Sequence, residues 1–208
     1  MTVETANALC RYFETLYGLN QKLFVLCGAD VYDRTSEYER LIDEVVMSVP
    51  RLVPYSFNKK TATYEITQAD GLMKFSNDIP FLSKDYEDIL QKHKDCLEKV
   101  KKVRNKLEHE MHGAEIVASS SGNISFYFVI YSISEQRIKL GVLEIIEFVK
   151  DMNILFSKLQ KLAKQFAYDN KYNDHPYFRR LSRFDFADFN RIFESDLLYF
   201  FGKALQPF

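Results

Sequence analysis

Apolar residues recur every three or four positions along four stretches of the chain, which is the spacing of one buried face of an α-helix. The four stretches cover approximately residues 4–27, 36–49, 84–112 and 138–168. Thr35 or Ser36 is placed to cap the second stretch, and Pro50 ends it. At 1.5 Å per residue the fourth stretch would be about 46 Å long, enough for the spine of a bundle. The pattern predicts a mainly α protein.

Three other segments break this period. Residues 124–131 change to a period of two, and we expect them to pair with residues 114–118 across a Ser-Gly-Asn turn. This predicts a small β-hairpin insertion over 114–133, after the third helix. Residues 61–67 and 72–75 predict a further short hairpin or an ordered loop. A basic and aromatic segment begins at Pro176 and leads into a final helix, so a helical extension is expected over about 176–205.

The length and composition of the chain bound its organisation. A chain of 208 residues with 47% hydrophobic residues can bury a core, and no repeat, low-complexity linker or Gly-rich phosphate loop divides it. A single domain over residues 1–208 is therefore predicted. The 18 Phe and 13 Tyr residues predict an aromatic core and favour an aromatic interface. A net charge of −1 argues against a globally basic protein that binds nucleic acid over its whole surface.

The third stretch carries the most distinctive polar pattern of the chain. At about 100° per residue, five polar side chains fall across an arc of roughly 140° on this helix. In angular order they are Arg104, Glu108, His112, Asn105 and His109. An apolar stripe adjoins them and consists of Cys96, Leu97, Val100, Val103, Leu107 and Met111. The polar arc thus borders a packing surface, where a cleft between two helices or two subunits would form.

The run Arg104-Asn105-x-x-x-His109 resembles the signature of the HEPN family, small all-helical domains found in toxin–antitoxin, abortive-infection and CRISPR-associated ribonucleases. The resemblance implies an antiparallel helical bundle that cleaves RNA without a metal or cofactor. It also implies a homodimer in which two Arg/His sets share a composite site, acting as a toxin or phage-defence effector with an antitoxin protein as a further partner. Met111 stands where toxin-like members commonly have Tyr, and His112 follows it.

The resemblance assigns roles that suit the residue types. His109 would carry the proton transfers because an unperturbed imidazole titrates near neutral pH. Arg104 would hold the phosphate oxygens as negative charge builds on them. Asn105 would orient the imidazole or a phosphate oxygen, and Glu108 and His112 are auxiliary candidates.

Basic residues surround this motif. Residues 91–106 hold seven Lys or Arg residues and two acids, so one helix face could guide a phosphate backbone, with Lys94 and Lys101 on the arc of Arg104. The alternative is a solvated charged face. Near the C-terminus, Arg179, Arg180 and Arg183 neighbour the aromatic residues Tyr177, Phe178 and Phe184. This segment would either grip a single strand or pack onto the bundle.

Other interpretations of the motif remain open. Arg104 and Glu108, at i and i+4, could form an exposed ion pair while His109 caps the helix end. His109 and His112 could bind a metal, although no carboxylate completes a ligand set. A catalytically silent HEPN-like module that binds a nucleotide, RNA or a protein would keep the same bundle, and a purely structural helical dimer would not use the polar arc.

The cysteines and the N-terminus favour a cytoplasmic protein. Cys10, Cys27 and Cys96 are odd in number and form no CxxC pair, as expected in a reducing compartment. The first residues lack a basic patch followed by an apolar core, so no secretory signal is predicted. Residues 116–134 lack charges but are interrupted by Ser-Ser-Ser-Gly-Asn, which argues against a membrane span.

Overall fold

The computed structural model of the protein describes residues 1–27, 36–53, 55–58, 63–66, 79, 81–110 and 140–194, and these residues form a mainly helical bundle. The helices are α1 (Val3–Cys27), α2 (Ser36–Ser48), the 3-10 helix η1 (Val49–Leu52), α3 (Leu82–Lys92), α4 (Lys94–Glu110), α5 (Val142–Asp169) and α6 (Pro176–Leu181). The chain is helical again from residue 186 to residue 194, the last residue that the structure describes. The predicted mainly α character is confirmed for this part of the chain, whereas the insertion at 114–133 lies outside it.

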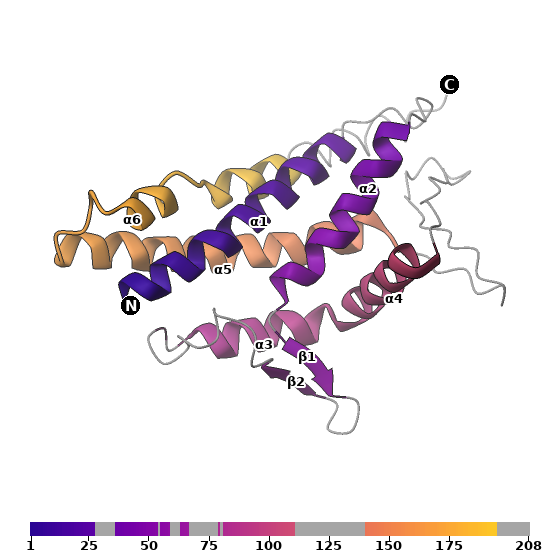
Figure 1. Ribbon diagram of the computed structural model, residues 1–208, viewed down its shortest axis with the longest axis horizontal. Coiled ribbons are helices and arrows are strands. Elements are labelled where there is room, and N and C mark those ends of the chain that lie inside the picture. The colour runs from indigo at the N-terminus through magenta and orange to yellow at the C-terminus, as the bar shows by residue number, and fades with distance from the viewer. Residues whose placement is uncertain are drawn as a thin grey trace.

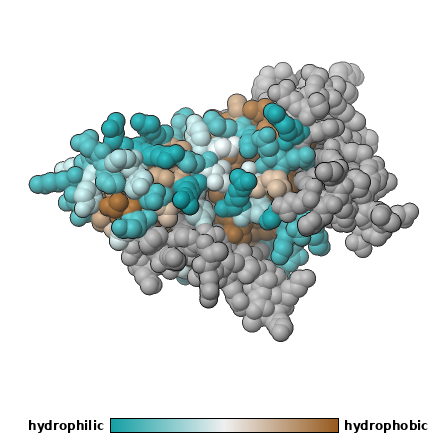
Figure 2. All heavy atoms as spheres, viewed as in Figure 1, coloured by the Kyte–Doolittle hydropathy of each residue, from teal (hydrophilic) through white to brown (hydrophobic). Residues whose placement is uncertain are grey.

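The longest helix, α5, runs through the centre of the molecule (Figure 1). Its 28 residues correspond to about 42 Å at 1.5 Å per residue. Helix α1 packs against α5, α6 and α2, while α3 contacts α5 and α4 contacts α2 and η1. In the same view, the described surface is mostly hydrophilic with small hydrophobic patches (Figure 2). No helix among the described residues has both the length and the apolar character needed to cross a membrane.

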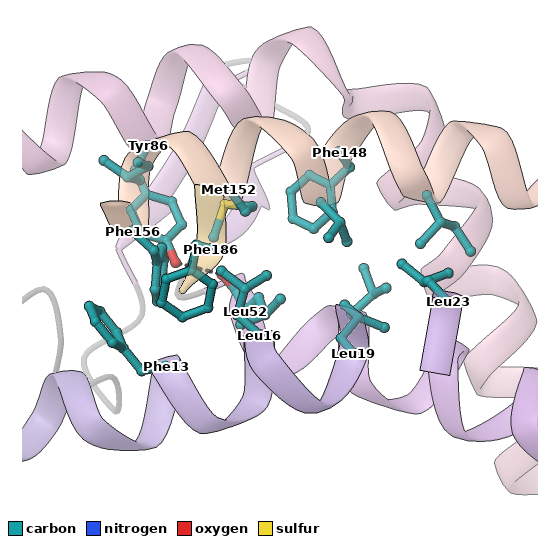
Figure 3. Packing of buried hydrophobic residues seen from close by; sticks show 14 of the residues in the cluster. Phe13, Leu16, Leu19, Leu23, Leu52, Tyr86, Phe148, Met152, Phe156 and Phe186 are labelled. Atoms are coloured by element: carbon teal, nitrogen blue, oxygen red, sulfur yellow. Dashed lines mark hydrogen bonds between the residues drawn. The ribbon is translucent and has the colours of Figure 1, made fainter. Parts of the chain in front are cut away.

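Aromatic rings from three separate parts of the chain meet in the core (Figure 3). The Phe13 ring of α1 lies 5.1 Å from the ring of Phe156 on α5 and 5.1 Å from the ring of Phe186. All three residues are at most 1% exposed. Tilted and edge-on ring pairs of this kind are favourable beyond the area that they bury. The predicted aromatic core is confirmed, and it joins the C-terminal extension to the bundle.

Three asparagine amides cross this core as a chain of hydrogen bonds. Asn20 and Asn153, both fully buried, each donate to the side-chain oxygen of the other at 2.8 Å. Asn153 also donates to Asn190 at 2.8 Å, and Asn190 donates to the carbonyl oxygen of Lys150 at 3.0 Å. Because a buried amide is costly when it lacks partners, this network favours one alignment of α1, α5 and the last described segment.

The third predicted helix, expected as one element over 84–112, is divided into α3 and α4 at His93. The backbone N–H of His93 still bonds to the carbonyl of Ile89 at 3.0 Å, but the residue leaves helical geometry, with φ −104° and ψ 18°. Its ring contacts Asp151 on α5. Figure 1 shows the change of direction between the two helices. The prediction of one continuous helix was therefore wrong.

A two-stranded antiparallel sheet precedes α3. Strand β1 (Tyr55–Asn58) pairs with β2 (Thr63–Ile66), with Tyr55 opposite Ile66 and Asn58 opposite Thr63. The strand expected within 61–67 is confirmed, but its partner is the preceding segment. Residues 72–75, its expected partner, lie outside the described part of the chain.

Candidate functional site

Helix α4 carries four residues of the polar arc on one continuous helical backbone. Arg104, Asn105, Glu108 and His109 all fall within Lys94–Glu110. Arg104 is partly buried and Asn105 is exposed. The side chains of Glu108 and His109, and the whole of His112, lie outside the description. The geometry of an α-helix brings residues 104, 105, 108 and 109 onto neighbouring positions within about two turns.

The apolar side of α4 anchors these residues. Cys96, Leu97, Val100 and Val103 are all less than 9% exposed, as the predicted stripe requires. Helix α4 contacts α2, η1 and α3. Arg104 follows directly after the fully buried Val103, so its partial burial places it at the edge of the packing surface. The predicted border between polar arc and apolar stripe is confirmed for the described side chains.

The basic residues around the motif divide into two groups. Lys99 donates to both carboxylate oxygens of Glu144 on α5, each at 2.8 Å, and Lys92 donates to Asp151 at 2.7 Å. These two lysines hold helices together. Lys101 is exposed and Lys94 is partly buried. The face that could meet a phosphate backbone is therefore smaller than the count of seven cations indicates.

His93 forms a carboxylate–imidazole pair that sequence reasoning missed. Its Nε2 atom lies 2.6 Å from Oδ2 of Asp151, and its ring stands edge-on to Phe148 at 5.7 Å. His93 is 9% exposed. Burial alone would raise the pKa of Asp151, but hydrogen bonds and charge from Lys92 and His93 outweigh it and lower that pKa below its ordinary value. Because 58 residues separate the partners, no local pattern reveals the pair.

We expect this pair to shape the acid side of the stability profile. Because the folded-state pKa of Asp151 is depressed, its contribution to stability is present above the unfolded pKa of about 3.9 and disappears as pH falls through the lower folded value. Urea unfolding between pH 7 and acid should show a shallower acid-side loss of unfolding free energy for Asp151→Asn than for the wild type.

The exposed carboxylate of Asp88 supplies the control for that experiment. Asp88→Asn should retain the wild-type profile. An equal acid-side loss in Asp151→Asn and the wild type would contradict the role given to the pair.

A shallow pocket of about 260 Å³ lies beside this pair, between α3 and α5. Its lining residues are Asp85, Asp88, Ile89, Lys92, Asp151, Ile154, Leu155 and Lys158. Lys158 bonds to Asp85 at 2.8 Å, and Lys92 bonds to Asp151 at 2.7 Å. Most of its charged groups therefore satisfy one another, and they fasten α3 to α5. Within the described residues, no group of three or more His, Cys, Asp or Glu side chains could hold a metal ion.

The two cysteines whose burial is described are poor nucleophiles. Burial, followed by the nearby Glu144 carboxylate, raises the pKa of the Cys96 thiol to about 12. Burial also raises the pKa of Cys10, whose Sγ donates to the carbonyl of Tyr177 at 3.6 Å. A thiol with a raised pKa forms little thiolate near neutral pH, so these two residues serve packing.

The basic and aromatic segment near the C-terminus packs its aromatic side chains on the core and exposes its arginines. Phe178 is 4% exposed, and Tyr177 and Phe184 pack against the same core. Arg180 forms an ion pair with Glu14 of α1. The packing interpretation therefore holds for the aromatic residues, whereas the side chains of Arg179 and Arg183 are exposed.

Comparisons with known proteins add no assignment: no protein-family model, curated protein or solved structure matches the chain.

Proposed function

We propose that the protein is a metal-independent endoribonuclease whose catalytic residues are Arg104, Asn105 and His109 of α4. The observation that supports this most directly is the position of Arg104 and Asn105 beside the buried stripe of the same helix. Val100 and Val103 are at most 1% exposed, Arg104 is partly buried beside them, and Asn105 is exposed. Side chains at such a border are fixed by the bundle and remain accessible to a ligand. The resemblance to the HEPN signature supplies the reaction class.

The proposed reaction needs no group beyond these side chains and the RNA. His109 takes the proton from a 2′-hydroxyl, whose oxygen attacks the adjacent phosphorus and forms a new P–O bond. The bond from phosphorus to the 5′-oxygen breaks, and that oxygen leaves with a proton from the protonated imidazole of a second His109, which the proposed dimer supplies. Arg104 stabilises the negative charge that accumulates on the phosphate oxygens between these steps. The products are a 2′,3′-cyclic phosphate and a 5′-hydroxyl.

The proposal includes a homodimer in which the α4 helices of two subunits face each other. Proton removal and proton return occur on opposite sides of the phosphate, so two sets of Arg and His serve them more readily than one set. A two-fold axis brings identical surfaces together. Light scattering should then give about twice the chain mass of 24.5 kDa.

Cleavage of a labelled RNA in excess chelator tests the proposed reaction. We expect undiminished cleavage, a 2′,3′-cyclic phosphate or its 3′-phosphate hydrolysis product, and no cleavage of an all-deoxy strand, because that strand lacks the attacking hydroxyl. Chelator-sensitive cleavage would contradict the mechanism. Binding of RNA without any cleavage, if Arg104→Ala weakens that binding, would instead identify a catalytically silent module that uses the same face of α4.

A further inference from the structure

The turn between α5 and α6 gathers exposed cations and tyrosines at the end of the bundle opposite α4 (Figure 1). Residues 161–183 hold six Lys or Arg residues and two acids, in a chain whose net charge is −1. Six of the exposed cations and tyrosines of this stretch form what we call the α5–α6 seam. They are Lys164, Tyr168, Lys171, Tyr172, Arg179 and Arg183. This end of the molecule is mostly hydrophilic in Figure 2.

One buried side chain fixes the two sides of the seam against each other. Gln160 of α5 is 8% exposed, and its Nε2 atom donates to the carbonyl oxygens of Leu181, at 2.7 Å, and Phe184. Arg183 lies between those two acceptors, and Lys164 lies one helical turn beyond Gln160 on the same face of α5. Both cations therefore border the line along which the two segments meet.

The tyrosines lie at the end of the same line. Tyr172 stacks on Phe178 with ring centroids 6.1 Å apart and an interplanar angle of 10°, and 40% of it remains exposed. Phe178 in turn stacks on Phe166 at 5.6 Å. Tyr168 is 73% exposed. The Tyr172 ring is thus held in place before any ligand arrives, which reduces the entropy lost on binding.

The positive charge of the seam is poorly compensated. Among the described residues, the side chains of Lys164, Lys171, Arg179 and Arg183 form no ion pair. The two acids of the stretch are Asp169 and Asp174, and Asp169 accepts a hydrogen bond from Gln165 at 2.8 Å. Lys92 of α3 and Lys99 of α4 differ from these cations, because each is bonded to a carboxylate of α5.

We propose that the α5–α6 seam binds a single-stranded nucleic acid. Its four cations contact successive phosphates, and Tyr168 and Tyr172 stack on bases, which must be unpaired to offer a free face. This binding goes beyond the proposed cleavage and does not depend on it. The residues between Glu144, which contacts α4, and Tyr168 rise about 36 Å along α5. A stacked strand would need about ten nucleotides to reach from the seam to α4.

An oligothymidine of about twelve nucleotides is the probe, within the usual range of single-strand site sizes. Because it lacks the 2′-hydroxyl, its binding is measured separately from the proposed cleavage. We expect the double variant Lys164→Gln with Arg183→Gln to bind more weakly and to lower the slope of log affinity against log salt by about 1.4, since each phosphate contact on a single strand contributes about 0.7. Tyr168→Ala should weaken binding about fivefold or more, and Tyr168→Phe should retain it.

The matched control removes one exposed Lys and one exposed Arg elsewhere, through Lys84→Gln with Arg51→Gln. It changes the net charge equally and should leave the slope unchanged. An unchanged slope in the seam variant, or an equal loss in both variants, would overturn the proposal. So would binding of the wild type to phosphatidylserine vesicles without any binding to oligothymidine, which would identify a lipid contact. If the wild type binds oligothymidine but does not cleave RNA, that result would count against the proposed function and not against binding at the seam.

Discussion

His109→Ala is expected to reduce RNA cleavage by about 10²–10⁴, the usual contribution of a positioned acid–base group. Arg104→Ala should reduce it by about 10²–10³, as the loss of one group that stabilises developing charge commonly does. Both residues belong to the polar arc of α4, and the buried stripe of the same helix holds α4 in the bundle. The two substitutions therefore remove reacting groups and leave the packing surface in place. Single-turnover rates on a labelled RNA measure both effects directly.

Two measurements separate lost chemistry from lost structure. Thermal unfolding of both variants should stay close to that of the wild type, because the change falls outside the apolar stripe. Arg11→Ala, which removes an exposed arginine from α1, should retain wild-type cleavage. Wild-type turnover by His109→Ala would rule out the catalytic assignment and leave RNA or protein binding as the better account of the arc.

Phe156→Ala is expected to lower the free energy of unfolding by about 3–5 kcal/mol, the range for deleting a buried ring. Phe156 is fully buried and its ring contacts those of Phe13 and Phe186, so the cavity would open where three segments meet (Figure 3). That loss is a large fraction of the total stability of a typical domain, about 5–15 kcal/mol. Urea unfolding followed by circular dichroism would measure it.

Ile154, two residues earlier on the same helix, provides the matched comparison. It is 52% exposed, so Ile154→Ala should change the unfolding free energy by only about 0.5 kcal/mol. Similar losses in the two variants would show that α5 is not packed as described.

The sequence predicted the helices well where one side of each helix is buried continuously. The expected first helix, 4–27, is α1 at Val3–Cys27, because every turn of it carries a core residue from Ala6 to Leu26. The second is α2 at Ser36–Ser48, with Pro50 in the 3-10 turn that follows. Helix α5 begins at Val142, four residues later than expected.

Features that depend on distant partners could not be predicted in this way. At the bend, the His93 ring contacts Asp151, which belongs to another helix. The hydrogen-bonded residues Asn20 and Asn153 lie 133 positions apart in the sequence. Neither of them, taken alone, indicates that it has a buried polar partner. Of the candidate site, the apolar stripe and the exposure of Asn105 followed from helical spacing. The ion pair that removes Lys99 from the basic face did not, because its partner Glu144 is on α5.

The burial of α1 against α5 also affects how the chain folds during its synthesis. Residues 28–141 separate the two helices, and synthesis at about 5–20 residues per second means that α1 waits roughly 6–23 s before synthesis of α5 begins. During that time α2 and η1 are available to cover α1, whereas α5 and α6 are not, and the Phe13 ring lacks its partners Phe156 and Phe186. A nascent chain halted before residue 142 would therefore present a 25-residue amphipathic helix as a binding surface for chaperones that recognise exposed apolar segments.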